Sequence, residues 1–379
     1  MSNKDKDEYY DSLVNREIKG TKSRYKLNRK IGVGGMGAVF EAINLTDNSR
    51  VAIKTISPQL AHNQTFVRRF QREAKVGWIL SHPNIIKVYE FGETGDSEDK
   101  LYFMAMEFVE GESLRSYLRS SGPLAPTECL EILRPLCEGL EAAHKRKLLH
   151  RDLKPDNIML SKTQDGKWTV KLADFGLVKL LEPDSEITKG ANLTQAGEVF
   201  GTPHYMAPEQ VLGHQISPAS DIYALGVITY QMLTGKLPVE GSDIRQLLIA
   251  KVSKEPPLPS EKNPSVHKAF DPVLKKALAR SPEDRYFTVG DFFKDFQKVV
   301  IRLSDTGELK ISQEALADIR KEYFVEDMSS NSQATLIKQT TPEKALPSSS
   351  ESSKTKNLLP LILGGILLLL IAILVIIFN

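Results

Sequence analysis

Apolar and polar residues alternate along the front of the chain with the two-residue period of β-strands. One stretch, Phe66 to Leu80, interrupts this alternation with helical spacing. The five predicted strands are Tyr25 to Ile31, Ala38 to Ala42, Arg50 to Ile56, Ile86 to Phe91 and Leu101 to Glu107.

From Leu114 onward, apolar residues recur at helical spacing. The clearest predicted helices are Cys129 to His144, Ser220 to Leu233 and Asp271 to Ala279. A β-rich part followed by an α-rich part predicts an α+β fold of two packed lobes rather than a βαβ sheet. We expect one lobe over about residues 25–109, the other over about 110–303, and a ligand site in the cleft between them.

The flanking segments have a different composition. Residues 1–24 are charged and lack apolar periodicity, which predicts a flexible arm. Residues 304–357 begin with a short predicted helix, Ser312 to Phe324, and continue into a Ser/Thr-rich stretch typical of a disordered linker.

Residues 358–378 contain no charged side chain over 21 positions. As a helix this segment would be about 31 Å long, which matches the hydrocarbon thickness of a bilayer. We therefore expect a transmembrane helix rather than a buried core helix. Lys354 and Lys356 precede it, so the body of the chain is expected on the cytoplasmic side.

Charge and cysteine content exclude other classes. The 379 residues carry 50 Lys and Arg against 48 Asp and Glu, a net charge of +2, which disfavours a general nucleic-acid binder. The two cysteines, Cys129 and Cys137, are too few for a disulfide framework or a zinc site and are expected to be reduced and buried.

A glycine-rich segment lies between the first two predicted strands. It reads Gly-x-Gly-x-x-Gly-x-Val from Gly32 to Val39, and glycines let a backbone approach phosphates closely. A dinucleotide-binding site would need a helix after the glycines, whereas here a strand follows.

A lysine and a glutamate follow this loop in the sequence. Lys54 ends Val51-Ala52-Ile53-Lys54 on a predicted strand, and Glu73 lies on the predicted helix. Alone, Lys54 could be an ordinary exposed strand residue. Paired with Glu73, its ammonium would point at a phosphate.

The most specific segment is His150-Arg151-Asp152-Leu153-Lys154-Pro155-Asp156-Asn157. Asp174-Phe175-Gly176 follows it, and Gly201-Thr202-Pro203 and Ala207-Pro208-Glu209 close a long loop. With these ordered motifs, residues 25 to 303 resemble a protein kinase, specifically the bacterial eukaryotic-like (Hanks-type) serine/threonine kinases.

The resemblance implies a bilobal kinase fold, to which the C-terminal membrane anchor is added as a separate segment. It also implies a role for each motif residue. Lys54, held by Glu73, would contact the ATP phosphates, Asp152 would accept the hydroxyl proton, and Lys154 would steady the transferred group. Asn157 and Asp174 would bind Mg²⁺, for which Mn²⁺ could substitute. The implied ATP-binding residues are Ile31, Gly32, Val33, Gly34, Gly35, Met36, Gly37, Ala38, Val39, Ala52, Lys54, Met106, Glu107, Val109 and Met159.

The resemblance also implies regulation and partners. Arg151 would clamp a phosphorylated activation loop, with Thr194 as the candidate phosphosite and Thr202 facing the catalytic loop. Expected partners are proteins bearing Ser or Thr, the membrane (in a bacterium, the inner membrane), and a second copy for autophosphorylation in trans. Gly77, inside the predicted helix, suggests a loosely held helix.

Two alternatives remain. A pseudokinase would lack metal or base positions, whereas Lys54, Asp152, Asn157 and Asp174 are all present. A membrane-tethered adaptor recruiting partners through residues 304–357 could coexist with catalysis.

Overall fold

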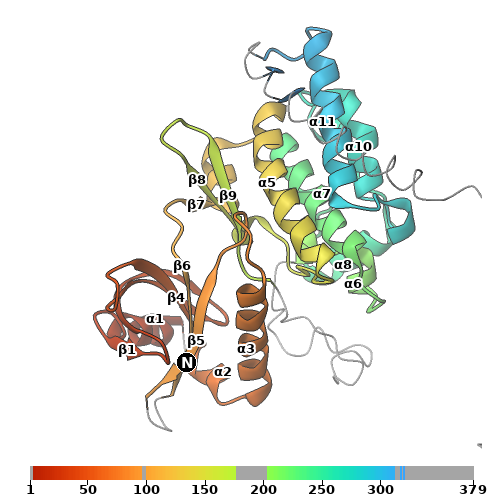
Figure 1. Cartoon of the computed structure of the whole chain (residues 1–379). Coiled ribbons are helices and arrows are strands. Elements are labelled where there is room, and N and C mark those ends of the chain that lie inside the picture. Colours follow the sequence, from red (N-terminus) through yellow and green to blue (C-terminus); the bar gives the residue numbers. More distant parts are fainter. Residues whose placement is uncertain (1–2, 96–99, 176–202, 312–315, 318, 321–379) are drawn as a thin grey trace, which may run out of the picture. The chain divides into compact units, whose positions relative to one another are not determined.

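A six-stranded antiparallel sheet forms the first lobe. Five of its strands lie where the alternating pattern predicted strands, and the sixth, Glu17–Lys19, was not predicted. The computed structural model describes residues 3–95, 100–175, 203–311, 316–317 and 319–320. The strand order is β1-β2-β3-β4-β6-β5 (Figure 1). The strands are β1 (Glu17–Lys19), β2 (Arg24–Gly34), β3 (Gly37–Asn44), β4 (Arg50–Thr55), β5 (Val88–Thr94) and β6 (Leu101–Glu107).

Each face of this sheet has its own apolar core, because successive side chains of a strand point to opposite faces. Phe40 and Phe103 are fully buried on one face. The other face packs against α2 (Pro58–Ala61) and α3 (Gln64–Ile79), through Val67 and Phe70 of α3. The Asn63 side chain caps α3 by accepting a hydrogen bond from the Thr65 N–H.

The prediction of a flexible arm over residues 1–24 is wrong. Helix α1 (Asn3–Ser12) and strand β1 precede β2, and Tyr10, Leu13 and Ile18 are 1 %, 2 % and 1 % exposed. These side chains join the core on the face that α3 does not cover. The segment is mainly charged, so its few apolar residues form no recognisable pattern in the sequence. They are buried because the folded sheet offers them an apolar face.

Helices make up most of the second lobe. The helices are α4 (Leu114–Ser121), α5 (Pro126–Lys145), α6 (Pro208–Val211), α7 (Pro218–Thr234), α8 (Ile244–Ser253), α9 (Pro259–Lys262), α10 (Asp271–Ala277) and α11 (Val289–Asp305). Short 3₁₀ turns are η1 (Pro155–Asn157), η4 (Pro203–Tyr205), η5 (Lys268–Phe270) and η6 (Pro282–Asp284).

Helix α7 is the centre of this lobe and is buried along nearly its whole length, packed by α5 and α10 (Figure 1). A helix that is apolar on all sides belongs inside a core. Ser217 caps its start, and Gly235, with φ of 70°, ends it in the left-handed region that glycine adopts without strain.

A small sheet lies at the boundary between the lobes. Its strands are β7 (Glu112–Ser113), β8 (Ile158–Lys162) and β9 (Trp168–Leu172), in the order β7-β8-β9. The turn η1, at the end of the His150–Asn157 segment, runs directly into β8, and β9 leads to Asp174. The sheet therefore connects this segment to Asp174.

The chain after α11 folds back onto the second lobe. Leu316 is 5 % exposed, and the Gln297 side chain of α11 donates a hydrogen bond to the Ile319 carbonyl at 3.2 Å. Four residues of the predicted helix Ser312–Phe324 are described. The linker and the predicted transmembrane helix 358–378 lie outside the described residues, within which no helix is long and apolar enough to cross a membrane.

Both cysteines are buried and unoxidised, as the sequence predicted. Cys129 and Cys137 lie on α5 and form no disulfide. Burial raises the pKa of the Cys129 thiol, so it packs as an apolar side chain.

Candidate active site

Three charged side chains meet where the two lobes face each other. The Lys54 ammonium on β4 lies 2.8 Å from Glu73 Oε1 on α3 and 2.8 Å from Asp174 Oδ1, which follows β9. The predicted Lys54–Glu73 pair is therefore formed, and Asp174 extends it into a triad.

Burial sets the charge of this triad. Burial alone would lower the pKa of Lys54, but the carboxylates of Asp174 and Glu73 outweigh burial and raise it, so Lys54 stays protonated. Burial and the negative charge of the neighbouring Asp174 raise the pKa of Glu73 to about 7, against the opposing attraction of Lys54. The pKa of Asp174 is lowered, since its attraction to Lys54 exceeds the effect of burial.

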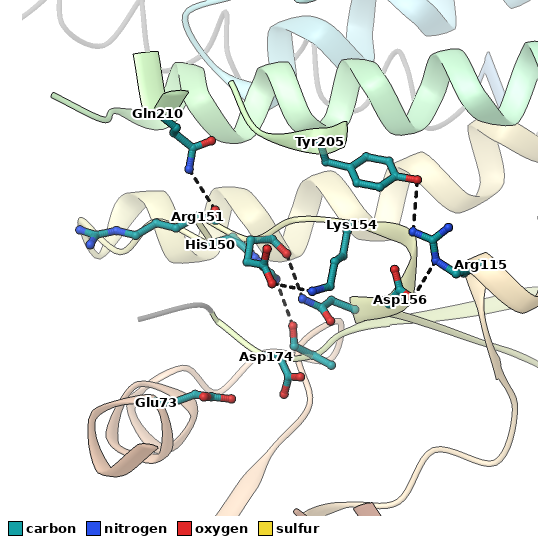
Figure 2. Close-up of polar contacts among 12 residues, drawn as sticks. Glu73, Arg115, His150, Arg151, Lys154, Asp156, Asp174, Tyr205 and Gln210 are labelled. Carbon is teal, nitrogen blue, oxygen red and sulfur yellow. Dashed lines mark hydrogen bonds and ion pairs between the residues drawn. The ribbon is translucent and has the colours of Figure 1, made fainter. Parts of the chain in front are cut away.

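The predicted base and its neighbours form one compact turn in η1 and the residues before it. Lys154 Nζ donates to Asp152 Oδ2 at 2.7 Å, and Asn157 Nδ2 donates to the Asp152 carbonyl at 2.9 Å. The Asn157 carbonyl in turn accepts from the Ala173 N–H at 2.8 Å. This last bond ties the turn to the residue that precedes Asp174, and Figure 2 labels Lys154 and Asp174 in this region.

The donor set fits a magnesium ion. Because Asn157 Nδ2 is committed to Asp152, its side-chain oxygen is left to face a cation together with Asp174. Within the described residues no three Asp, Glu, His or Cys side chains cluster as a metal site. Proteins hold Mg²⁺ through one or two carboxylate oxygens plus substrate phosphates, so Asn157 and Asp174 are donors of a suitable kind.

Asp221, on α7, holds the turn in an unusual backbone conformation. Its carboxylate accepts the His150 and Arg151 N–H groups at 2.9 Å each, and His144 Nε2 lies 2.8 Å away. Arg151 has a φ of 65°, which costs a non-glycine residue free energy unless the surroundings fix it. Asp221 is thus a positioning residue for this turn.

The buried His150 ring links this turn to the segment of Asp174. Burial lowers its pKa, so the ring is neutral, and its Nε2–H donates to the Ala173 carbonyl at 3.0 Å. Its ring centroid lies 4.8 Å from that of Phe175. Asp174 itself has a φ of 52°, a second strained position at the site.

Five of the implied ATP-binding side chains belong to one apolar cluster. Ala52 and Met106 are directly paired across β4 and β6 and are almost fully buried. Three partly buried implied ATP-binding side chains from both lobes pack against it, namely Val39, Val109 and Met159. Glu107, at the end of β6, instead pairs through its side chain with Lys171 on β9 at 2.7 Å.

The glycine-rich segment forms the tip of the β2–β3 hairpin, where Gly34 pairs with Gly37. Ile31 and Val33 are exposed, at 42 % and 45 %, on the approach to the tip. The Met36 carbonyl accepts from the Ser57 N–H at 2.7 Å, so the tip leans on the end of β4. A side chain at Gly37 would overlap the Thr55 carbonyl, which explains a glycine there.

Gly77 has a different meaning from the one the sequence suggested. It is buried on α3, and an added Cβ would overlap the Val88 side chain on β5. The glycine therefore lets α3 pack closely against the sheet rather than loosening the helix. Glu73, one turn earlier, is accordingly in contact with Lys54.

The regulatory residues are described in part. Arg151 is half-buried, and its carbonyl accepts from Gln210 Nε2 of α6 at 3.0 Å. Thr194 and Thr202 lie outside the described residues, as do Gly176 and Gly201. Next to this region, Arg285 binds Glu209 with two hydrogen bonds of 2.7 and 2.8 Å.

Sequence reasoning missed a second charged cluster beside the turn. Arg115, on α4, donates to Asp156 Oδ1 at 2.7 Å, and Tyr205 lies next to both (Figure 2). Asp156 belongs to the segment His150–Asn157, but the sequence assigned it no role. Arg115 lies 41 positions away, which no local pattern could reveal.

Comparison with known proteins agrees with this geometry. The family model described as the protein kinase domain matches residues 25–294. The chain is 35 % identical over 285 residues to the serine/threonine-protein kinase PrkC of Bacillus subtilis, covering 75 % of this chain and 41 % of that protein.

The serine/threonine-protein kinase PknB of Mycolicibacterium smegmatis is 36 % identical over 276 residues, which cover 73 % of this chain and 43 % of that protein. The chain thus spans less than half the length of these curated relatives. Among solved structures, the PknI kinase domain of Mycobacterium tuberculosis aligns with a TM-score of 0.56 at 28 % identity, covering 74 % of this chain and 98 % of that one.

Proposed function

We propose a serine/threonine protein kinase activity for this chain, which belongs to the protein kinase family. The activity transfers the γ-phosphoryl group of ATP to Ser or Thr hydroxyls of proteins. The observation that carries the proposal is the Lys54–Glu73–Asp174 triad facing the Asp152–Lys154 pair.

The geometry supports a separate role for each of these residues. Glu73 holds the Lys54 ammonium in place for the phosphates of ATP. Asp152, fixed by Lys154 at 2.7 Å, orients the attacking hydroxyl and accepts its proton. Lys154 then balances charge on the transferred group, so the protein contributes mainly positioning and electrostatic stabilisation.

Asn157 and Asp174 would hold magnesium at this site. When bound, Mg²⁺ would supply positive charge that neutralises the phosphates. The apolar cluster of Ala52, Met106 and Met159 offers the adenine ring a water-poor surface from both lobes.

Phosphotransfer from radiolabelled ATP to a general protein substrate tests this proposal, with Lys54→Met as the matched variant. We expect the wild-type protein to label the substrate, and we expect the labelling rate of the variant to be lower by a factor of about 100 or more. Equal labelling by both proteins would contradict the assignment. Nucleotide binding without transfer by the wild-type protein would favour the pseudokinase alternative.

The apolar segment 358–378 supports a second element of the proposal, attachment to a membrane with the kinase domain in the cytoplasm. Such a tether would raise the local concentration of membrane substrates without new contacts. Membrane flotation of the full chain against a variant lacking residues 358–378 tests it. Equal recovery of both in the membrane fraction would contradict the tether.

Activation by autophosphorylation is the third element, with a second copy acting in trans on Thr194 and Arg151 binding the phosphate. Its support is the half-buried Arg151 guanidinium, whose pKa burial lowers, so that a phosphate would compensate its lost hydration. Mass spectrometry of the autophosphorylated protein, compared with Thr194→Ala, is the check. Unchanged loop phosphorylation and activity in the variant would exclude Thr194.

A further inference from the structure

An internal ion pair occupies the rim of the proposed active site. Arg115 follows the first residue of α4, and its Nε donates to Asp156 Oδ1 at 2.7 Å. Asp156 belongs to η1, between Lys154 and Asn157. Figure 2 shows the pair on the side of the turn away from Glu73.

Neighbouring side chains fix the arginine in this position. The Tyr205 hydroxyl donates to Gln231 Oε1 at 2.6 Å and accepts from Arg115 Nη2 at 3.5 Å. The guanidinium carbon lies 5.8 Å from the centre of the Tyr205 ring. Tyr205 is 3 % exposed, so the support is rigid.

Helix stability does not explain the arginine. A cation in the first turn of a helix is opposed by the helix dipole, and α4 has no acidic residue there. The pair also remains accessible, with 31 % of the Arg115 side chain and 41 % of the Asp156 side chain exposed. A partly exposed pair of this kind contributes little to folding.

A substrate must pass close to this pair. An accepting hydroxyl has to reach Asp152, and Asn157 folds the turn back onto the Asp152 carbonyl. Asp156 is therefore on the same small turn as the base. An extended peptide advances about 3.3 Å per residue, so residues a few positions from the acceptor lie over this turn.

We propose that Arg115 is a specificity-determining residue that neutralises Asp156 toward the substrate. An unpaired Asp156 carboxylate at this rim would attract lysine or arginine. With Arg115 in place, the site takes substrates with a neutral or acidic side chain at that position and disfavours a basic one. The inference rests on the proposed kinase activity.

A positional-scanning peptide library, phosphorylated by the full-length protein and by variants, tests this inference. For Arg115→Ala we expect the rate on peptides with lysine or arginine at one position near the acceptor to rise about 10-fold relative to alanine there. For Asp156→Asn we expect the opposite change, a several-fold gain for acidic peptides at the same position. Arg119→Ala, which alters an exposed arginine of the same helix, keeps the wild-type profile.

Arg115→Ala and Asp156→Asn together distinguish specificity from a folding defect. If the pair had only a structural role, each variant would lower the rates on all peptides alike, and the ratio of the rates on acidic and basic peptides would stay the same. An unchanged ratio in active Arg115→Ala and Asp156→Asn proteins would overturn the inference alone. So would a wild-type preference for basic peptides at that position. A wild-type protein that phosphorylates no peptide would contradict the kinase activity, and the inference with it.

Discussion

Lys251 is a buried lysine whose ammonium lacks a hydrogen bond in the described structure. It lies on α8, is 1 % exposed, and places Nζ 5.1 Å from the centre of the Tyr223 ring. Burial lowers its pKa to about 7. The Arg285 guanidinium lies 4.9 Å from the centre of the same ring, so the Tyr223 ring has two cationic neighbours.

The resulting prediction concerns stability and pH. Between pH 7 and 10.5 the unfolded chain protonates Lys251 while the folded protein leaves it largely neutral, so unfolding takes up a proton and stability rises with pH. Lys251→Met should therefore raise the free energy of unfolding at pH 7 by about 2 kcal/mol, and this gain should shrink toward pH 10. Denaturant unfolding at several pH values measures it.

Lys254→Met, an exposed lysine at the end of the same helix, is the matched control and should change little. A Lys251→Met protein that is less stable than the wild type at pH 7 would show that the buried ammonium makes a favourable contact.

At the scale of elements, close packing of α3 against the sheet determines the position of Glu73. Gly77 permits the contact with Val88, and Glu73 lies one turn before it on the same helix. Because the helix moves as a rigid unit, a displacement at Gly77 reaches the carboxylate that holds Lys54.

We therefore expect Gly77→Ala to lower kcat/KM for ATP about 10-fold by displacing α3. Val88→Ala in the same protein should restore most of the loss, since it vacates the space that the new methyl group needs. Steady-state phosphotransfer measures both. If Gly77→Ala were as active as the wild type or more active, helix propensity rather than packing would dominate at this position.

The N-terminal helix is a second element that contacts the strand leading to the glycine-rich segment. Lys30, next to the glycine-rich segment, pairs with Asp7 at 3.1 Å and with Asp11 at 2.7 Å, both on α1. Leu13 anchors the segment in the core. The α1 helix is thus a part of the folded lobe that steadies the start of the glycine-rich hairpin.

Leu13→Ala should cost about 2–5 kcal/mol, as for other buried leucines, and lower the melting temperature by about 5–10 °C. Thermal unfolding followed by circular dichroism measures this change. Glu8→Ala, at an exposed position on α1, serves as the control. A flexible arm would give no difference between the two variants.

At the scale of the whole molecule, the residues that the sequence predicted best are those whose chemistry is tied to a local motif. Lys54, Glu73, Asp152, Lys154 and Asn157 occupy the predicted arrangement. The two lobes followed from the change of apolar period, because burial on one face of a strand or helix leaves that period in the sequence.

The missed features depend on contacts that leave no such pattern. The residues of α1 are mainly charged, and only the finished sheet gives Tyr10 and Leu13 a surface to cover. Arg115 and Asp156 are joined by the meeting of α4 and η1. Gly77 was misinterpreted because helix propensity is local, whereas its neighbour Val88 belongs to a strand.

The most direct test of the central claim is single-turnover phosphotransfer by Asp152→Asn, together with its affinity for ATP. We expect a rate about 1000-fold below that of the wild type, because the hydroxyl would lose its proposed base. We expect a nearly unchanged affinity for ATP, because the Asp152 side chain pairs with Lys154 and not with Lys54, the residue proposed to bind the phosphates. A variant that transfers phosphate at the wild-type rate would contradict the account.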